Sequence, residues 1–318
     1  MSDTTAYMFS GIDGLDHLSD RLMMLTLPQV KDRISQAQEI LHRIAPGFDL
    51  TEYISSPDEI YKKEFSLQAI AVTVVQIGLF DFYTSNGEKP DYVMGCSLGD
   101  VARSYVSGCL DYEVVVAASW NYHLKTKEIK GCGAYHIKVL DGVITNERIQ
   151  EIYDAGIYYA VEQTPRHFLV TGTLDKLAAW KAKESEIKRY RINPIYDKPL
   201  HSPLMSSITQ ETYDLYSHTV KPPTEWKYKM LSSAHLKVIE SRDDLLKDMV
   251  DNFNSTVYWM QSLQFAAKEL GIKRFVNVGP AQTLILFGER TPLESPVEFV
   301  DYLAKIQPTQ PISKNLAP

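Results

Sequence analysis

A serine flanked by glycines constrains the fold of this chain more than any other sequence feature. Gly95–Gly99 reads GCSLG; it follows an apolar, strand-compatible run and precedes a helix-compatible run that starts at Leu98. A tight turn from strand to helix needs positions without side chains where the two elements nearly touch, and glycine supplies them. The sequence therefore predicts a sharp strand-to-helix turn that exposes the Ser97 hydroxyl.

Such a turn suits a nucleophile. The first free N–H groups of the helix, including that of Leu98, would point at an oxyanion forming on an acyl group attached to Ser97. An ordinary strand–turn–helix is the alternative interpretation, because five-residue matches also occur by chance.

Composition narrows the class of protein. The chain has 318 residues with 44% hydrophobic and 23% charged side chains, which allows a sizeable core. Its formal net charge of −7 argues against a nucleic-acid partner. Cys96, Cys109 and Cys132 have neither disulfide nor metal-ligand spacing, and the N-terminus lacks a basic and apolar leader. We expect a soluble, cytoplasmic monomer without a metal or a membrane-spanning segment.

The order of predicted elements indicates an α/β protein with an insertion. Residues 131–194 follow the order β-α-β-β-α-β, which is typical of a small ferredoxin-like unit. Residues 1–130 and 195–318 then form one larger α/β body. Within it, Phe65–Phe82 is a strongly apolar helix that Gln68 and Gln76 make too polar to span a membrane; we expect it to pack beneath Ser97.

Ser97 needs a base, because a free hydroxyl is a poor nucleophile at neutral pH. His201 is the best candidate, since it lies in a loop between Pro199 and Pro203. A lone loop histidine is more often a surface or core residue, but the other histidines considered fall on predicted helices or on the inserted unit. No carboxylate is obviously placed to orient His201, so a dyad held by backbone carbonyls and a full triad both remain open.

These segments together resemble the malonyl-CoA:acyl-carrier-protein transacylase family, and more narrowly the stand-alone acyltransferases and acyl hydrolases that act in trans in polyketide biosynthesis. Phe9–Gly14 (FSGIDG) resembles the family's N-terminal F-[PS]-G-Q-G loop, Gly95–Asp100 its G-x-S-L-G-E motif, and Pro199–Met205 its histidine loop. The resemblance implies an α/β-hydrolase-like large subdomain with a parallel sheet and an inserted ferredoxin-like subdomain.

The resemblance also implies roles for individual residues. Ser97 would be the acylated nucleophile and His201 the general base and then acid. The backbone N–H groups of Leu98 and Ile12 would form the oxyanion hole, and a main-chain carbonyl near Asn252 would orient His201. No cofactor would be bound permanently; CoA or the phosphopantetheine arm of a carrier protein would deliver the acyl group.

Departures from the family pattern concern the acyl pocket. Tyr122 stands twenty-five positions after Ser97, where the family has the arginine that binds malonate. A buried carboxylate without a cation is strongly unfavourable. Leu200 adds apolar surface, Cys96 replaces a histidine, and Ile12 replaces a glutamine. We therefore expect a pocket for uncarboxylated acyl groups; substitution of the missing cation by an arginine such as Arg103 is the alternative.

The resemblance leaves two enzymatic functions open. We place hydrolytic removal of acyl groups from the acyl carrier protein domains of a polyketide synthase slightly ahead of acyl transfer from CoA or a carrier protein. A catalytically silent docking subunit and a patatin-type lipase with a Ser/Asp dyad are further alternatives. The basic residues of 181–191 could meet an acidic carrier protein, or they form a solvated helix face.

Overall fold

A six-stranded sheet forms the centre of the large subdomain. The computed structural model describes residues 4–301, so the ends of the large-subdomain assignment, 1–3 and 302–318, lie outside the described residues. The strand order is β11-β10-β1-β2-β7-β8, parallel except for β8. The strands are β1 (Thr5–Phe9), β2 (Tyr92–Gly95), β7 (Lys229–Ser232), β8 (Lys237–Ile239), β10 (Arg274–Asn277) and β11 (Glu298–Asp301). A parallel sheet covered by helices is the architecture expected of an α/β fold.

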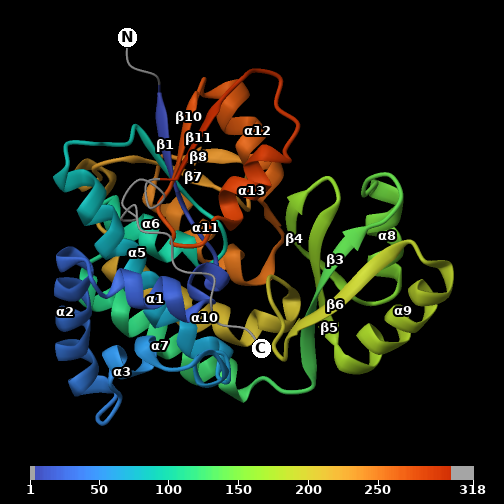
Figure 1. The fold of residues 1–318 in the computed structure, drawn as a ribbon, viewed down its shortest axis with the longest axis horizontal. Coiled ribbons are helices and arrows are strands. Elements are labelled where there is room, and N and C mark those ends of the chain that lie inside the picture. Colours follow the sequence, from blue (N-terminus) through green and yellow to red (C-terminus); the bar gives the residue numbers. More distant parts are fainter. Residues whose placement is uncertain (1–3, 302–318) are drawn as a thin grey trace, which may run out of the picture.

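The inserted unit is a second sheet beside the first (Figure 1). Its strand order β6-β3-β5-β4 is ferredoxin-like, and α8 and α9 pack on it. The short β9 (Val257–Tyr258) of the large subdomain extends this sheet by pairing in parallel with β4. The elements are β3 (Cys132–Val139), α8 (Asn146–Asp154), β4 (Tyr158–Thr164), β5 (His167–Thr173), α9 (Leu174–Ile187) and β6 (Tyr190–Tyr196). The predicted fold class is confirmed.

A buried helix supports the large sheet. Helix α5 (Gln68–Ser85), preceded by the 3₁₀ turn η2 (Phe65–Leu67), contacts α2, α6 and α7. By length and composition alone, Phe65–Ser85 could cross a membrane, although we expected its glutamines to make it too polar. However, 83% of its most apolar window is buried inside the protein. The polar side chain of Gln76 is accommodated in this buried helix because its Nε2 donates to the Ser10 carbonyl and hydroxyl oxygens, both at 2.8 Å. This burial identifies a core helix.

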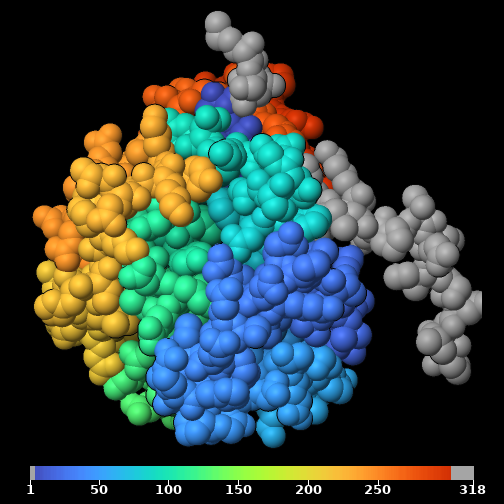
Figure 2. Space-filling model, turned by 90° about the vertical axis from the view of Figure 1, so that its left-hand side faces the viewer, coloured from blue at the N-terminus to red at the C-terminus, as the bar shows by residue number. Residues whose placement is uncertain are grey.

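The remaining helices surround these elements. Figure 2 shows α7 (green) between the N-terminal helices (blue) and the segment containing α10 (yellow) on one face of the large subdomain. The remaining helices of the large subdomain are η1 (Ile12–Leu15), α1 (Leu18–Met24), α2 (Pro28–Ile44), α3 (Leu50–Ser55), α4 (Asp58–Tyr61), α6 (Gly99–Val106), α7 (Tyr112–Glu128), η3 (Pro203–Met205), α10 (Ser206–Thr219), η4 (Pro223–Glu225), α11 (Arg242–Asn254), α12 (Trp259–Glu269) and α13 (Thr283–Glu289).

A buried ion cluster joins α6 to α11. The Arg103 guanidinium lies 2.8 Å from Asp100 Oδ1 and 2.5 Å from Asp248 Oδ2, and it donates to the Leu231 carbonyl oxygen at 2.5 Å. All three charged side chains are at most 3% exposed. Arg103 thus connects α6, α11 and β7 in the interior.

Removing Arg103 should destabilise the fold strongly. Arg103→Met leaves two buried carboxylates without their cation, and we expect a loss of about 3–5 kcal/mol in the free energy of unfolding. The measurement is urea unfolding followed by circular dichroism. Arg43→Met is the matched control, because the Arg43–Glu113 pair is more than half exposed on both sides and should contribute less than about 1 kcal/mol. Equal losses in the two variants would contradict a structural role for the cluster.

Candidate active site

Ser97 lies on the predicted sharp turn between β2 and α6. Its φ is +58°, in the left-handed region that non-glycine residues rarely adopt. A Cβ on Gly95 would come within 2.3 Å of the Asp100 nitrogen, and one on Gly99 within 2.1 Å of the Phe9 carbonyl oxygen. Both glycines are therefore required by the close approach of backbone, as the sequence predicts.

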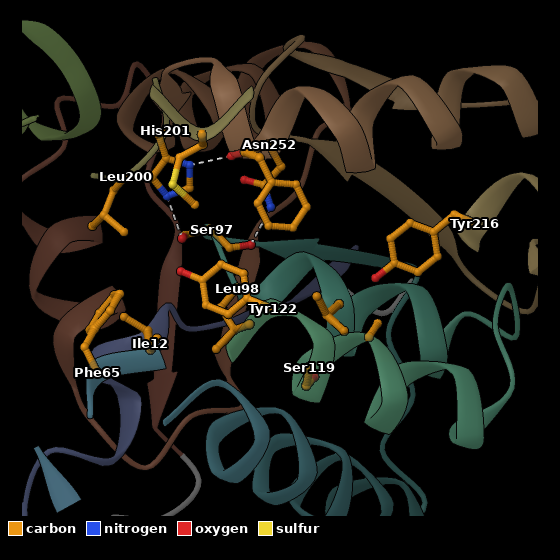
Figure 3. A pocket seen from close by; sticks show the side chains of 14 residues that line it. Ile12, Phe65, Ser97, Leu98, Ser119, Tyr122, Leu200, His201, Tyr216 and Asn252 are labelled. Atoms are coloured by element: carbon orange, nitrogen blue, oxygen red, sulfur yellow. Dashed lines mark hydrogen bonds between the residues drawn. The ribbon is translucent and has the colours of Figure 1, made fainter. Parts of the chain in front are cut away.

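His201 is placed to accept a proton from Ser97. Its Nε2 lies 2.7 Å from Ser97 Oγ, and its Nδ1 lies 2.5 Å from the Asn252 main-chain carbonyl oxygen (Figure 3). A carbonyl oxygen only accepts, so Nδ1 carries the proton and the neutral ring presents a free Nε2 lone pair to Ser97. The structure brings together the three residues that we expected, with a backbone carbonyl in place of the acid of a triad.

The side chain of Asn252 adds a contact that the sequence analysis missed. Its Nδ2 donates to the Ser97 carbonyl oxygen at 2.9 Å. Asn252 therefore holds Ser97 through its side chain and His201 through its main chain. No sequence pattern signals such a bond, because the partner is a main-chain atom 155 residues away.

Burial tunes His201 toward its neutral form. Desolvation lowers the pKa of His201 from 6.5 to about 4, although the hydrogen bond to Asn252 acts in the opposite direction. The side chain is 8% exposed. His201 is therefore neutral, and able to act as a base, throughout the neutral range.

Two backbone N–H groups beside Ser97 are available for an oxyanion. Among the described residues, no hydrogen-bond partner is found for the N–H of Leu98 or of Ile12. The loop that carries Ile12 packs on the turn, since a Cβ on Gly11 would lie 3.8 Å from Ser97 Cβ. The Gln76 bonds to Ser10 hold this loop from below. Two preorganised donors of this kind can stabilise a tetrahedral intermediate.

A cavity opens beside Ser97 and His201 (Figure 3). The empty space there, counted together with the solvent at its mouth, is about 590 Å³. Tyr122 and Leu200 line it, as expected. The remaining lining residues are apolar or uncharged: Ile12, Phe65, Leu98, Val101, Ala118, Ser119, Met205, Tyr216, Asn252 and Phe253. Within the described part of the chain, the lining contains no ionisable side chain other than His201 and tyrosines.

Cys96 lies on the other side of the turn from the position we expected. It faces a second hollow, the cleft between the two subdomains, and packs in the same apolar cluster as Met94. Residues two apart on a strand share a face, so Cys96 stays on the Met94 side, whereas Ser97 at the turn lines both hollows. Burial raises the pKa of the Cys96 thiol well above its usual value, so the thiol does not compete with Ser97 as a nucleophile.

The cleft carries acidic side chains. Asp13 and Asp16 line it together with Ser97 and His201. Burial, with a smaller contribution from Asp16, raises the pKa of Asp13 to about 6. Among the described residues, no group of histidine, cysteine, aspartate and glutamate side chains has the arrangement of a metal site.

Arg103 does not supply the missing cation. Its guanidinium is fully buried between Asp100 and Asp248, and it does not line the cavity beside Ser97. Arg103 lies close to Ser97 in the sequence, but α6 directs the Arg103 side chain into the protein interior. The alternative in which Arg103 replaces the arginine of the family is therefore wrong.

The low pKa of His201 predicts an unusual pH dependence. Because a neutral Nε2 is needed, the rate constant for acylation of Ser97 should stay flat from pH 7.5 down to about 5.5 and fall as the pH approaches 4. The measurement is quenched-flow intact mass with an acetyl thioester of pantetheine, which has no group titrating in this range. Circular dichroism checks that the protein stays folded. A half-maximal rate near pH 6.5 would contradict the expected shift.

The chain is similar to curated polyketide synthases over most of its length. It is 23% identical over 279 residues to a highly reducing polyketide synthase of Alternaria alternata; the match covers 82% of this chain but 9% of the synthase. The chain thus spans about a tenth of the length of the relatives that it matches.

Solved structures have the same fold. A malonyl-CoA:acyl carrier protein transacylase from Helicobacter pylori aligns with a TM-score of 0.80 at 16% identity, covering 94% of both chains. A malonyl-transacylase in complex with its type II polyketide synthase acyl-carrier protein aligns with a TM-score of 0.80 at 16% identity, covering 94% of this chain and 95% of that one. A sequence model of the acyl transferase domain matches residues 21–314, and this chain therefore belongs to the acyl transferase domain family of enzymes.

Proposed function

We propose that this acyltransferase moves an uncarboxylated acyl group between thioesters through an acyl-Ser97 intermediate. His201 Nε2 takes the Ser97 proton while Oγ attacks the thioester carbonyl, and the N–H groups of Leu98 and Ile12 hold the oxyanion. Collapse of the intermediate breaks the C–S bond, and the proton passes from His201 to the leaving thiolate. A second thiol reverses these steps and carries the acyl group away.

The lining of the cavity beside Ser97 is the observation that carries the substrate class. Among residues 4–301 it has no lysine or arginine, and Tyr122 offers a neutral hydroxyl where the resemblance places arginine. Transfer of a malonyl carboxylate from water into such a cavity would cost several kcal/mol without a paired cation. Asp13 and Asp16 on the cleft side add negative charge. An acetyl or longer uncharged acyl group has no carboxylate to desolvate and is not repelled by Asp13 and Asp16.

Family membership favours transfer over hydrolysis, which reverses the order of our sequence-based expectation. Transfer needs a thiol to reach acyl-Ser97, and CoA or a carrier-protein phosphopantetheine arm can supply it through the cleft. An acyl carrier protein is our proposed partner, since a protein of the same fold forms a complex with one. Hydrolysis remains an outcome of the test below.

The cations around the cleft suggest where an acidic carrier protein would dock. His167 stacks on the cleft residue His136 with ring centroids 5.7 Å apart. Burial lowers the pKa of His167, and the positive charges of Arg290, Lys138 and Arg166 lower it further, which places these three cations near the cleft edge. In contrast, Lys183 is exposed on α9, which packs on the small sheet away from the large subdomain (Figure 1). Arg189 is already paired with Glu184 and Glu151. We therefore propose the cleft edge, not the 181–191 segment, as the docking site.

Acyl loading tests the proposed substrate class. Acetyl, butyryl and malonyl thioesters of CoA and of a polyketide-synthase carrier protein are incubated with the enzyme, and intact mass is recorded for both proteins. We expect acetyl- or butyryl-Ser97 and transfer to a second carrier protein, with no adduct on Ser97→Ala. Preferential malonyl loading would overturn the substrate class. Free acid released faster than acyl-carrier product would favour the hydrolase.

Restoring a cation should change the acyl preference. Tyr122→Arg places a guanidinium in the cavity, and we expect the malonyl-to-acetyl loading ratio to rise about tenfold or more, since a hydrogen bond to a charged group contributes roughly 1.5–3 kcal/mol. Tyr122→Phe is the control and should leave malonyl disfavoured. An unchanged ratio in Tyr122→Arg would show that Tyr122 does not face the acyl group.

Charge reversal tests the docking edge. Arg290→Glu should slow association with the acidic carrier protein by up to about tenfold at low salt, with the difference disappearing at high salt. Lys183→Glu makes the same charge change on α9 and should have little effect. Acyl transfer from a small pantetheine thioester should not change in either variant. The reverse pattern would assign docking to the 181–191 segment.

A further inference from the structure

The cavity beside Ser97 continues deeper than a two-carbon acyl group needs. Ala118 and Ser119 on α7, about one helical turn (about 5.4 Å) before Tyr122, also line it. A second small cavity between α7 and α10 shares four lining residues with it: Ala118, Tyr122, Tyr216 and Phe253. Tyr216 on α10 and Ser97 line the same cavity, so the space beside Ser97 extends along α7 to α10.

Tyr216 presents a hydroxyl to this space. The side chain is 3% exposed and lines both cavities. Figure 3 shows its oxygen directed into the cavity, on the side of Ser119. No described residue forms a hydrogen bond with the Tyr216 hydroxyl, and burial alone raises the pKa of this group. The hydroxyl oxygen is therefore open to the cavity, where a ligand or a water molecule can form the missing hydrogen bond.

The surroundings of Tyr216 make an acceptor the fitting partner. Ser119, which lines the same cavity, already donates its hydroxyl proton to the Val115 carbonyl oxygen at 2.9 Å. The path between Ser97 and Tyr216 is lined by apolar side chains such as Val101, Ala118 and Phe253. The hydrocarbon chain of an acyl group suits this apolar path, and an oxygen atom on that chain suits the end at the Tyr216 hydroxyl.

We propose that the enzyme selects an elongated, uncarboxylated acyl group whose distal part carries a hydroxyl or carbonyl oxygen, which accepts a hydrogen bond from Tyr216. Ala118 limits the length of the acyl group, because a larger side chain there would fill the passage between Ser97 and Tyr216. This inference rests on the proposed acyl-Ser97 intermediate and names the substrate class more closely.

Loading competition tests the role of the Tyr216 hydroxyl. The probes are pantetheine thioesters of hexanoate and of hexanoates hydroxylated at carbon 3, 4, 5 or 6, with acyl-Ser97 measured by intact mass. We expect one hydroxylated probe to load threefold to tenfold better than hexanoate, the range for a neutral hydrogen bond. Tyr216→Phe should remove this advantage. Tyr213→Phe, an exposed position on the same helix, is the matched control and should keep it.

Filling the passage tests the path. Ala118→Leu should lower the hexanoyl-to-acetyl loading ratio at least tenfold, because the longer chain loses its space. A ratio unchanged in Ala118→Leu, or the same hydroxyl preference in Tyr216→Phe and wild type, would overturn the inference while acetyl loading keeps the proposed function intact. Preference for malonyl, or no loading by any thioester, would overturn the proposed function itself and the inference with it.

Discussion

The hydrogen bond from His201 Nδ1 to the Asn252 main-chain carbonyl is the interaction on which the site depends. It fixes the ring tautomer, and the Asn252 side chain simultaneously holds the carbonyl of Ser97. Three segments distant in sequence therefore meet through main-chain atoms as much as through side chains. The position of α11 then controls both catalytic candidates, and the ion pair of Arg103 with Asp248 anchors that helix to α6. A substitution remote from Ser97 can disturb the site through this connection.

Local patterns predicted the fold wherever an element was long or regularly alternating. The inserted unit was predicted in full because its strands have seven or eight residues and its helices alternate with them. Strands β7 and β8 were missed, since four and three residues leave almost no periodicity to detect. Helix α10 was missed too: its sequence is rich in serine and threonine, and tertiary packing against α7 and α11 stabilises it.

The site was predictable where chemistry imposes a spacing and not where packing chooses the direction of a side chain. Ser97 followed from the glycines on either side, which steric contact requires. Cys96 and Arg103 are close to Ser97 in sequence, yet strand alternation turns one to the cleft and helix geometry turns the other inward. Tyr216 could not be found from sequence, because nothing in a polar helix marks one tyrosine as facing a cavity more than 100 residues away along the chain from the nucleophile.

The exclusion of a carboxylated acyl group that we propose would have two physical parts in this site. The cavity beside Ser97 would offer no attraction, since the part of the chain that the structure describes places no lysine or arginine in its lining. The cleft adds repulsion, because Asp13, with a pKa of about 6, is mostly ionised at pH 7 and lies on the loop that carries Ile12. The two parts act at different places: the cavity meets the acyl end, and the cleft meets the approaching thioester. A single cation placed in the cavity would attract the malonyl carboxylate but would leave the repulsion by Asp13 in place. One substitution should therefore recover malonyl loading only in part, and protonation of Asp13 below pH 6 should increase that recovery.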